Sequence, residues 1–326
     1  YMYVAKATDY QEYPMITDNR IWECLFIILG GNKYLEVTSI QDMPYAVIDM
    51  ENPEKVICRM ETEEFRTVLQ YVSKWYQDGI IDSDILGLSD NEANRAVQML
   101  LADQKPCETN STLSAVQQDY IPELYDKNPQ WQWDFYYYSQ NDPVYRCSLS
   151  NDTCTSISSK SLYPEKAIRF IELAHTNEAY YDLLCYGVEG INYEERDGKI
   201  FYDNIHSKDR HIAWTGLPDI FMEKQIRLKD EHWNTIVEKF QKEHPWKNMT
   251  IGDHPLNGFE IDYSNIVKDQ LERVWNTYMK PLICGGTKDW ESDYEIAMEK
   301  MYEAGLKEYI EEIQKQVSAY YQSKEN

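Results

Sequence analysis

The chain has 326 residues, 43% of them hydrophobic, which predicts a globular protein of two domains or one large domain rather than a disordered chain. Acidic residues outnumber basic ones by 56 to 32, and the formal net charge of −24 argues against non-specific binding to nucleic acids or anionic membranes. None of the seven cysteines stands in a Cys-x-x-Cys pair or at zinc spacing from a histidine, and no apolar run approaches the ~20 residues of a membrane-spanning helix.

The first sixty residues contain two predicted elements. Residues 21–29 form an apolar run that ends at Gly30, and the pattern alone fits either a helix or a strand. Residues 47–60 alternate in polarity well enough to predict a short hairpin, with its turn at Asn52-Pro53.

Residues 62–78 are predicted to form an amphipathic helix, because apolar side chains recur there at helical spacing. Thr62 is placed to cap its first turn, and Gly79 to end it. We expect this helix to cover a central sheet. A second helix is predicted over residues 91–102.

Short polar residues follow the segment that begins at Lys105. Asn110, Ser111 and Thr112 have two interpretations, as hydrogen-bonding groups for sugar hydroxyls or as caps of the next helix, and both can hold together. Residues 131–147 are rich in aromatic side chains, which predicts edge or crossing strands.

Residues 164–202 predict a helix that starts at a proline, a second helix, a glycine-flanked corner and a short hairpin. Glu189 lies in the corner between Gly187 and Gly190, which permit backbone angles that other residues avoid. Its carboxylate either faces a ligand or a hinge, or accepts hydrogen bonds from backbone N–H groups and fixes the corner.

The last third of the sequence is predicted to be helical. Apolar residues recur at helical spacing over residues 266–278 and 294–302, and Gly305 separates these segments from the last helix. In that helix the spacing alternates between four and three residues, which is typical of a coiled coil but extends over barely two heptads. We therefore expect it to pack against its own chain.

The sequence contains no motif of a serine hydrolase, zinc protease, P-loop or dinucleotide-binding fold. The acidic pairs are adjacent in sequence, so they do not provide the converging carboxylates that a glycoside hydrolase requires. The 27 tyrosines and 9 tryptophans suit amphipathic ligands such as sugars. Trp22 and Trp214 are the candidates for stacking on a sugar ring.

The segment 164–202 carries the strongest family resemblance. Its matching residues are Ser159, Lys160, Pro164, Glu165, Lys166, Ala167, Leu183, Leu184, Tyr186, Gly187, Glu189, Gly190 and Tyr193. Residues 74–81, 258–262, 304–305 and 311–316 carry weaker matches in the same order and spacing. Together they resemble one branch of the extracellular solute-binding proteins of bacterial ABC importers. The members of this branch are lipoproteins.

This resemblance implies an α/β fold of the type II periplasmic-binding-protein class, with two lobes, a helix-rich C-terminal third and an incomplete first lobe. It implies a non-enzymatic protein without a cofactor or metal that captures a mono- or oligosaccharide outside the membrane and delivers it to permease subunits. A peptide or another small polar solute is the alternative ligand, and a carbohydrate-acting hydrolase is the alternative of another class. The ligand-binding residues would be Trp22, Asn110, Ser111, Thr112, Glu189 and Trp214.

The resemblance also implies a domain order. Residues 1–150 would belong mainly to the second lobe, residues 151–212 to the first, and residues 213–326 would form helices that pack on the second. The crossings between lobes are expected near residues 105–110 and 145–157. In the family, a Trp is usually followed after two residues by Gly-Asn, whereas Trp214 is followed by Thr-Gly-Leu-Pro. The chain thus departs from the family pattern where the contact at Trp214 is expected.

Family members have a domain-sized segment ahead of the point where Tyr1 falls. We therefore expect the apolar face of the helix at 164–175, formed by Ala167, Ile168, Ile171 and Ala174, to be covered by a partner copy or by a segment outside this sequence.

Overall fold

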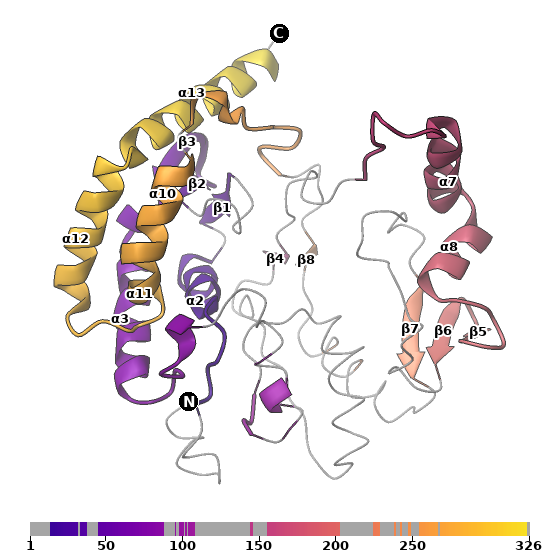
Figure 1. Ribbon diagram of the computed structural model, residues 1–326, viewed down its shortest axis with the longest axis horizontal. Coiled ribbons are helices and arrows are strands. Elements are labelled where there is room, and N and C mark those ends of the chain that lie inside the picture. Colours follow the sequence, from indigo (N-terminus) through magenta and orange to yellow (C-terminus); the bar gives the residue numbers. More distant parts are fainter. Residues whose placement is uncertain are drawn as a thin grey trace. The chain divides into compact units, whose positions relative to one another are not determined.

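The computed structural model describes residues 14–31, 33–37, 45–87, 95, 98–100, 102, 104–107, 144–145, 155–202, 224–228, 238, 242, 247–248, 254–266 and 268–324. The chain forms two compact units (Figure 1). Unit 1 consists of Tyr1–Ser111, Tyr136–Leu149 and Trp246–Asn326, and unit 2 consists of Thr112–Phe135 and Ser150–Pro245. Two of the boundaries fall close to the expected crossings, whereas the boundary at 245 lies beyond the expected one at 212. Which unit corresponds to which lobe stays a prediction.

Unit 1 contains a three-stranded antiparallel sheet in the order β1-β2-β3, formed by β1 (Tyr34–Glu36), β2 (Ala46–Asp49) and β3 (Asn52–Cys58). The predicted hairpin is present, but its turn lies at Met50-Glu51, because Asn52 already pairs with Asp49. The Asp49 carboxylate accepts a hydrogen bond from the backbone N–H of Glu51 at 2.9 Å, which fixes the turn.

Two helices of unit 1 pack together, α2 (Ile21–Gly30) and α3 (Glu63–Gln77). The apolar run at 21–29 is thus a helix. At the start of α3, Thr62 Oγ1 accepts a hydrogen bond from the backbone N–H of Phe65 at 3.2 Å, which confirms the predicted cap. The sequence predicted that α3 covers a sheet. Among the described elements, however, α3 packs mainly on α2 and α11 (Lys280–Ile283).

The C-terminal part of unit 1 is helical, as predicted. It contains α10 (Lys268–Val274), the π-helix η10 (Trp275–Met279), α11, α12 (Trp290–Glu303) and α13 (Leu306–Lys324). The π turn interrupts the helix predicted over 266–278. Short 3-10 turns, η2 (Arg59–Glu61), η3 (Ile85–Gly87) and η9 (Tyr263–Asn265), lie between the larger elements.

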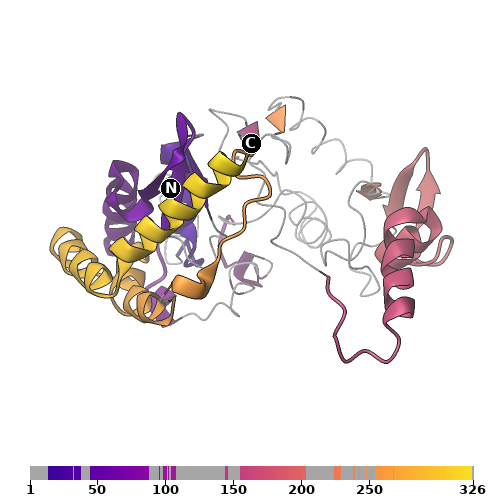
Figure 2. The ribbon, with the colours of Figure 1, turned by 90° about the horizontal axis from the view of Figure 1, so that it is seen from above.

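Two glutamine side chains of α13 fasten extended backbone segments. Gln314 accepts a hydrogen bond from the backbone N–H of Val56 at 2.9 Å and donates one to the carbonyl oxygen of Glu54 at 2.7 Å. Gln316 makes the same pair of bonds to the N–H and carbonyl of Asp262, each at 2.9 Å. The helix therefore lies along β3 and bonds to its backbone (Figure 2). Both glutamines belong to the 311–316 match, so this motif has a structural role.

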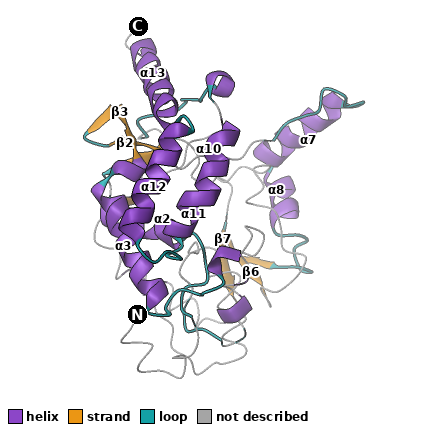
Figure 3. Ribbon diagram, turned by 60° about the vertical axis from the view of Figure 1, so that its left-hand side comes forward, coloured by secondary structure: helices purple, strands orange, loops and turns teal. Residues whose placement is uncertain are grey.

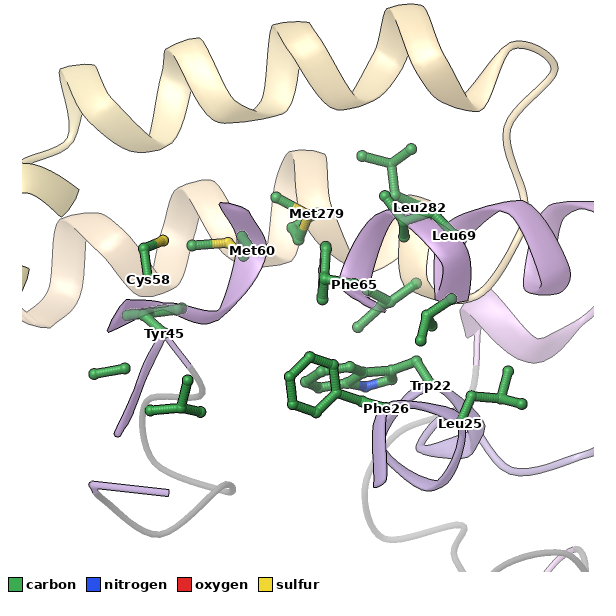
Figure 4. Packing of buried hydrophobic residues seen from close by; sticks show 14 of the residues in the cluster. Trp22, Leu25, Phe26, Tyr45, Cys58, Met60, Phe65, Leu69, Met279 and Leu282 are labelled. Atoms are coloured by element: carbon green, nitrogen blue, oxygen red, sulfur yellow. The ribbon is translucent and has the colours of Figure 1, made fainter. Parts of the chain in front are cut away.

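The core of unit 1 is aromatic at its centre (Figure 4). Trp22 of α2 meets Phe65 of α3 edge to face, with 5.9 Å between ring centroids, and Trp275 at 5.8 Å. Tyr45 lies between Trp275 and Tyr309, at 5.4 and 5.6 Å. The N-terminal and C-terminal parts of unit 1 are thus held together by one hydrophobic core.

The described part of unit 2 contains two helices and a small mixed sheet (Figure 3). The helices are α7 (Pro164–Thr176) and α8 (Glu178–Cys185), and the strands are β5 (Glu194–Arg196), β6 (Lys199–Tyr202) and β7 (Gln225–Leu228) in that order. Strands β5 and β6 form the predicted hairpin. Its two central residues, Asp197 and Gly198, have φ of 52° and 70°, as a tight two-residue turn requires.

The apolar face of α7 is open. Ala174 is buried, but Ile168 is 58% exposed and Ala167 and Ile171 are only half-buried. The same part of unit 2 also exposes Leu162, Tyr163, Phe170 and Leu183. Among the described residues, α8 packs on α7, but Ile168 stays exposed, so the expected cover of the rest of this face stays a prediction.

The rest of the described chain adds one short pairing. β4 (Val144–Tyr145) and β8 (Lys247–Asn248), both of unit 1, run parallel to each other. Most of the predicted helix at 91–102 and of the aromatic segment 131–147 lies outside the described residues. Within the described part, no helix has the length and apolar character needed to cross a bilayer.

Candidate functional site

Two extended segments of unit 1 lie side by side, one shortly before α2 and the other after α3. Ile16 and Ile81 form a parallel bridge, and the backbone N–H of Asp82 donates to the carbonyl oxygen of Ile16 at 2.9 Å. Because the segments are parallel, the residues that follow the bridge lie at the same edge. Those residues include two carboxylates, Asp18 and Asp82.

A third segment brings a lysine to this edge. Lys105 is buried, and its Nζ donates a hydrogen bond to Thr17 Oγ1 at 3.1 Å. The predicted ligand-binding residues Asn110, Ser111 and Thr112 follow soon after Lys105 in sequence, but they lie outside the described residues. Thr17, shortly before α2, and the segment that leads to 110–112 therefore meet.

Each of the two carboxylates is paired with an arginine. Asp18 Oδ1 accepts a hydrogen bond from the backbone N–H of Arg20 at 2.8 Å and lies 3.6 Å from Arg20 Nε. Asp82 Oδ2 lies 2.7 Å from Arg95 Nη1. We call Thr17, Asp18, Arg20, Asp82, Arg95 and Lys105 the α2 cluster.

The ion pairs of the α2 cluster are oriented alike relative to solvent. The side chains of Asp18 and Asp82 are 6% and 8% exposed, whereas those of Arg20 and Arg95 are 39% and 34% exposed. In each pair the carboxylate is therefore nearly buried and the arginine side chain is the partly exposed partner.

Behind the α2 cluster, the side chains of α2 surround a buried guanidinium. Arg59 is fully buried, lies over the rings of Trp22 and Phe26 and donates to Glu36 Oε1 at 3.2 Å. Burial raises the pKa of the Glu23 carboxyl to about 7, and the nearby Arg59 and Arg20 guanidinium groups only partly oppose this. Glu23 therefore binds a proton more readily than an ordinary glutamate.

The predicted site residues are not all brought together. Trp22 is only 3% exposed and packs in the core, so its stacking on a sugar stays a prediction that this packing does not favour. Glu189 is exposed in unit 2, and Asn192, not Glu189, fixes the corner, because Asn192 Oδ1 accepts a hydrogen bond from the backbone N–H of Val188 at 2.8 Å. Trp214, like residues 110–112, lies outside the described residues.

Sequence reasoning did not select the charged residues of the α2 cluster. One signal was present, because both segments end in an apolar stretch followed within two residues by an aspartate, at Ile16 to Asp18 and at Ile81-Asp82. Arg20 and Arg95 gave no signal, since their pairing depends on tertiary contacts. Among the described residues, no group of three or more His, Cys, Asp and Glu side chains is placed to hold a metal ion.

Comparisons with known proteins bear on the fold. A family described as a domain of unknown function, DUF3502, matches residues 255–322, which include α10, α11, α12 and most of α13. No curated protein matches the sequence.

Solved structures give the clearest similarity. The chain is similar to the N-glycan transport solute binding protein NgtS from Streptococcus pneumoniae, with a TM-score of 0.62 and 18% identity over 95% of this chain and 69% of that one. The complex of NgtS with Man5GlcNAc gives a TM-score of 0.58 and 19% identity over the same shares. The alginate-binding protein AlgQ2 gives a TM-score of 0.57 and 16% identity over 97% of this chain and 66% of that one. The chain therefore has the two-lobe α/β fold of the solute-binding proteins of ABC transporters, as its sequence motifs implied.

Proposed function

We propose that this protein is the solute-binding component of a bacterial ABC importer and that its solute is a carbohydrate. The observation that carries the proposal is the likeness to NgtS over 95% of the chain, including its complex with Man5GlcNAc. The protein would capture the solute outside the membrane, as a lipid-anchored protein, and deliver it to permease subunits.

The α2 cluster supports a binding role within unit 1. It gathers donors and acceptors from residues 17–20, Asp82, Arg95 and Lys105 of unit 1. The proposed contacts Asn110, Ser111 and Thr112 follow Lys105 in sequence. Groups of this kind bind sugar hydroxyls by hydrogen bonds and fix the orientation of a solute without covalent chemistry. Trp214 and Glu189 remain proposed contacts, the latter in unit 2.

The experiment is a thermal-shift screen of the protein, followed by calorimetric titration of the compounds that stabilise it. The compounds are mono- and oligosaccharides, including N-glycan and alginate fragments, together with short peptides. We expect oligosaccharides to raise the melting temperature, since a ligand that binds only the folded state stabilises it. Stabilisation by peptides alone would reject the sugar, and turnover of an oligosaccharide would favour the hydrolase.

Variants of the α2 cluster locate the site. Asp82→Asn removes the charge that holds Arg95 and should weaken sugar binding. Arg169→Gln is the matched control, because Arg169 forms an exposed ion pair with Glu172 on α7 of unit 2. Equal binding by both variants would place the site elsewhere and leave the solute-binding role intact.

A further inference from the structure

The α2 cluster is basic at its surface in a strongly acidic protein. Two arginines, Arg20 and Arg95, cover the carboxylates of Asp18 and Asp82 at this edge, whereas the whole chain has a net charge of −24. The side chains of the two carboxylates are nearly buried and those of the two arginines are partly exposed, so the part of each pair that a solute can reach is basic.

We propose that the solute is an acidic oligosaccharide, and that a carboxylate of one of its sugar units binds the exposed guanidinium groups of Arg20 and Arg95. This inference rests on the proposed function and specifies its substrate class. A neutral sugar needs hydroxyl partners only, so it gives no reason for two arginines turned outward with their counter-ions behind them.

The geometry of the pairs suits this ligand. A guanidinium group has five N–H donors in a plane, and a single carboxylate behind it leaves donors free for a second one. Asp18 and Asp82 are themselves fixed by backbone N–H groups, those of Arg20 at 2.8 Å and Asp84 at 3.0 Å. The arginines are thus held in place before the solute arrives, which reduces the entropy lost on binding.

The remaining acidic surface of the protein repels anions. The two partly exposed arginines therefore offer an acidic sugar a basic contact on an acidic protein.

The test compares two ligands that differ in charge alone, a uronic-acid trisaccharide and the same trisaccharide with its carboxyl groups reduced to CH₂OH. We expect the acidic form to bind about tenfold more tightly or better, because hydrogen bonds to charged groups are stronger than those to neutral ones. Raising the salt concentration from about 20 mM to about 500 mM should reduce this difference.

The variants assign the effect to the two arginines. Arg20→Gln and Arg95→Gln should each abolish most of the preference for the acidic form, Arg20→Lys should keep part of it because the charge remains, and Arg169→Gln should keep all of it. The melting temperature of each free variant shows that it is folded. Equal binding of both trisaccharides, or a preference unchanged in both arginine variants, overturns the inference but leaves the sugar-binding role standing. If no oligosaccharide of either kind binds, the proposed function itself fails.

Discussion

Gly285 shows how one residue decides a contact between two helical segments. Its φ is 77°, and a Cβ atom added there would lie 2.3 Å from the carbonyl oxygen of Val72 in α3. A methyl group would thus strain the backbone and push α11 away from α3. We expect Gly285→Ala to lower the free energy of unfolding by about 2–4 kcal/mol, measured by urea denaturation.

Gly79 provides a matched control for that variant. Its φ is 73°, but no atom lies within 4 Å of the added Cβ. Gly79→Ala should therefore lose only the conformational preference, about 1–2 kcal/mol. Equal losses in the two variants would show that the approach to Val72 does not matter.

Glu23 makes the stability depend on pH. The folded-state pKa of about 7 lies above the ordinary value of 4.5, so the folded state binds the proton more tightly than the unfolded state does. This contribution is fully present below pH 4.5 and is lost as the pH rises through 7. As the pH rises from 5 to 8, we expect the free energy of unfolding of Glu23→Gln to increase by about 1–3 kcal/mol relative to that of the native protein.

The measurement is urea denaturation at a series of pH values. The control is Glu63→Gln on α3, because this substitution removes a carboxylate that is exposed to solvent. A Glu23→Gln difference that stays constant from pH 5 to pH 8 would contradict the raised pKa.

At the scale of elements, α13 acts through its glutamines. Gln314 satisfies one donor and one acceptor of the exposed edge of β3 at the same time. We expect Gln314→Ala to lower the free energy of unfolding by about 1–3 kcal/mol, because both backbone groups lose their partner. Lys307→Ala, which removes only an exposed ion pair of α13 with Glu311, should cost less than about 1 kcal/mol. Similar losses would mean that water replaces the amide without penalty.

The elements differ in how far the sequence predicts them. α3 is predictable because its apolar face, its Thr62 cap and its terminal Gly79 agree. The run at 21–29 is ambiguous because α2 buries side chains on most of its circumference, so no polar face reveals the helical period. The π turn at 275–279 has no periodic sequence pattern that would predict it. The partners of α3 are helices instead of a sheet, because tertiary packing and not periodicity selects them.

The candidate site is less predictable than the fold. The resemblance brings the start of α2 and the segment at 105 together, but the functional side chains there are charged residues from distant segments. Arg95 and Asp82, for instance, are meaningful only as an ion pair. Trp22 illustrates the opposite difficulty, because an aromatic residue at the right position turned out to be part of the core.

At the scale of the whole molecule, each unit has its own stabilising contacts. In unit 2, Lys224 Nζ lies 2.7–2.9 Å from carboxylate oxygens of Glu178, Asp182 and Glu195, which connects α8, β5 and the start of β7. Burial disfavours the charge of Lys224, but its hydrogen bonds to these carboxylates outweigh this and raise its pKa. Removing the cation leaves like charges close together.

We expect Lys224→Met to lower the stability of unit 2 by about 2–4 kcal/mol and to leave unit 1 unchanged. Differential scanning calorimetry should then show one transition moved to lower temperature, while Gly285→Ala moves the other. A single transition that both variants shift equally would show that the units unfold as one.

The order of the segments in unit 1 affects how the protein is made. The bond between Gln314 and Glu54 joins residues 260 positions apart, and all of unit 2 lies between them in the chain. A ribosome adding about 5–20 residues per second needs roughly 10–50 s to pass from one partner to the other. During that time the hairpin of β2 and β3 has left the exit tunnel without the helix that covers it. The nascent chain is therefore most vulnerable to misfolding and proteolysis in unit 1, although that unit is the larger of the two.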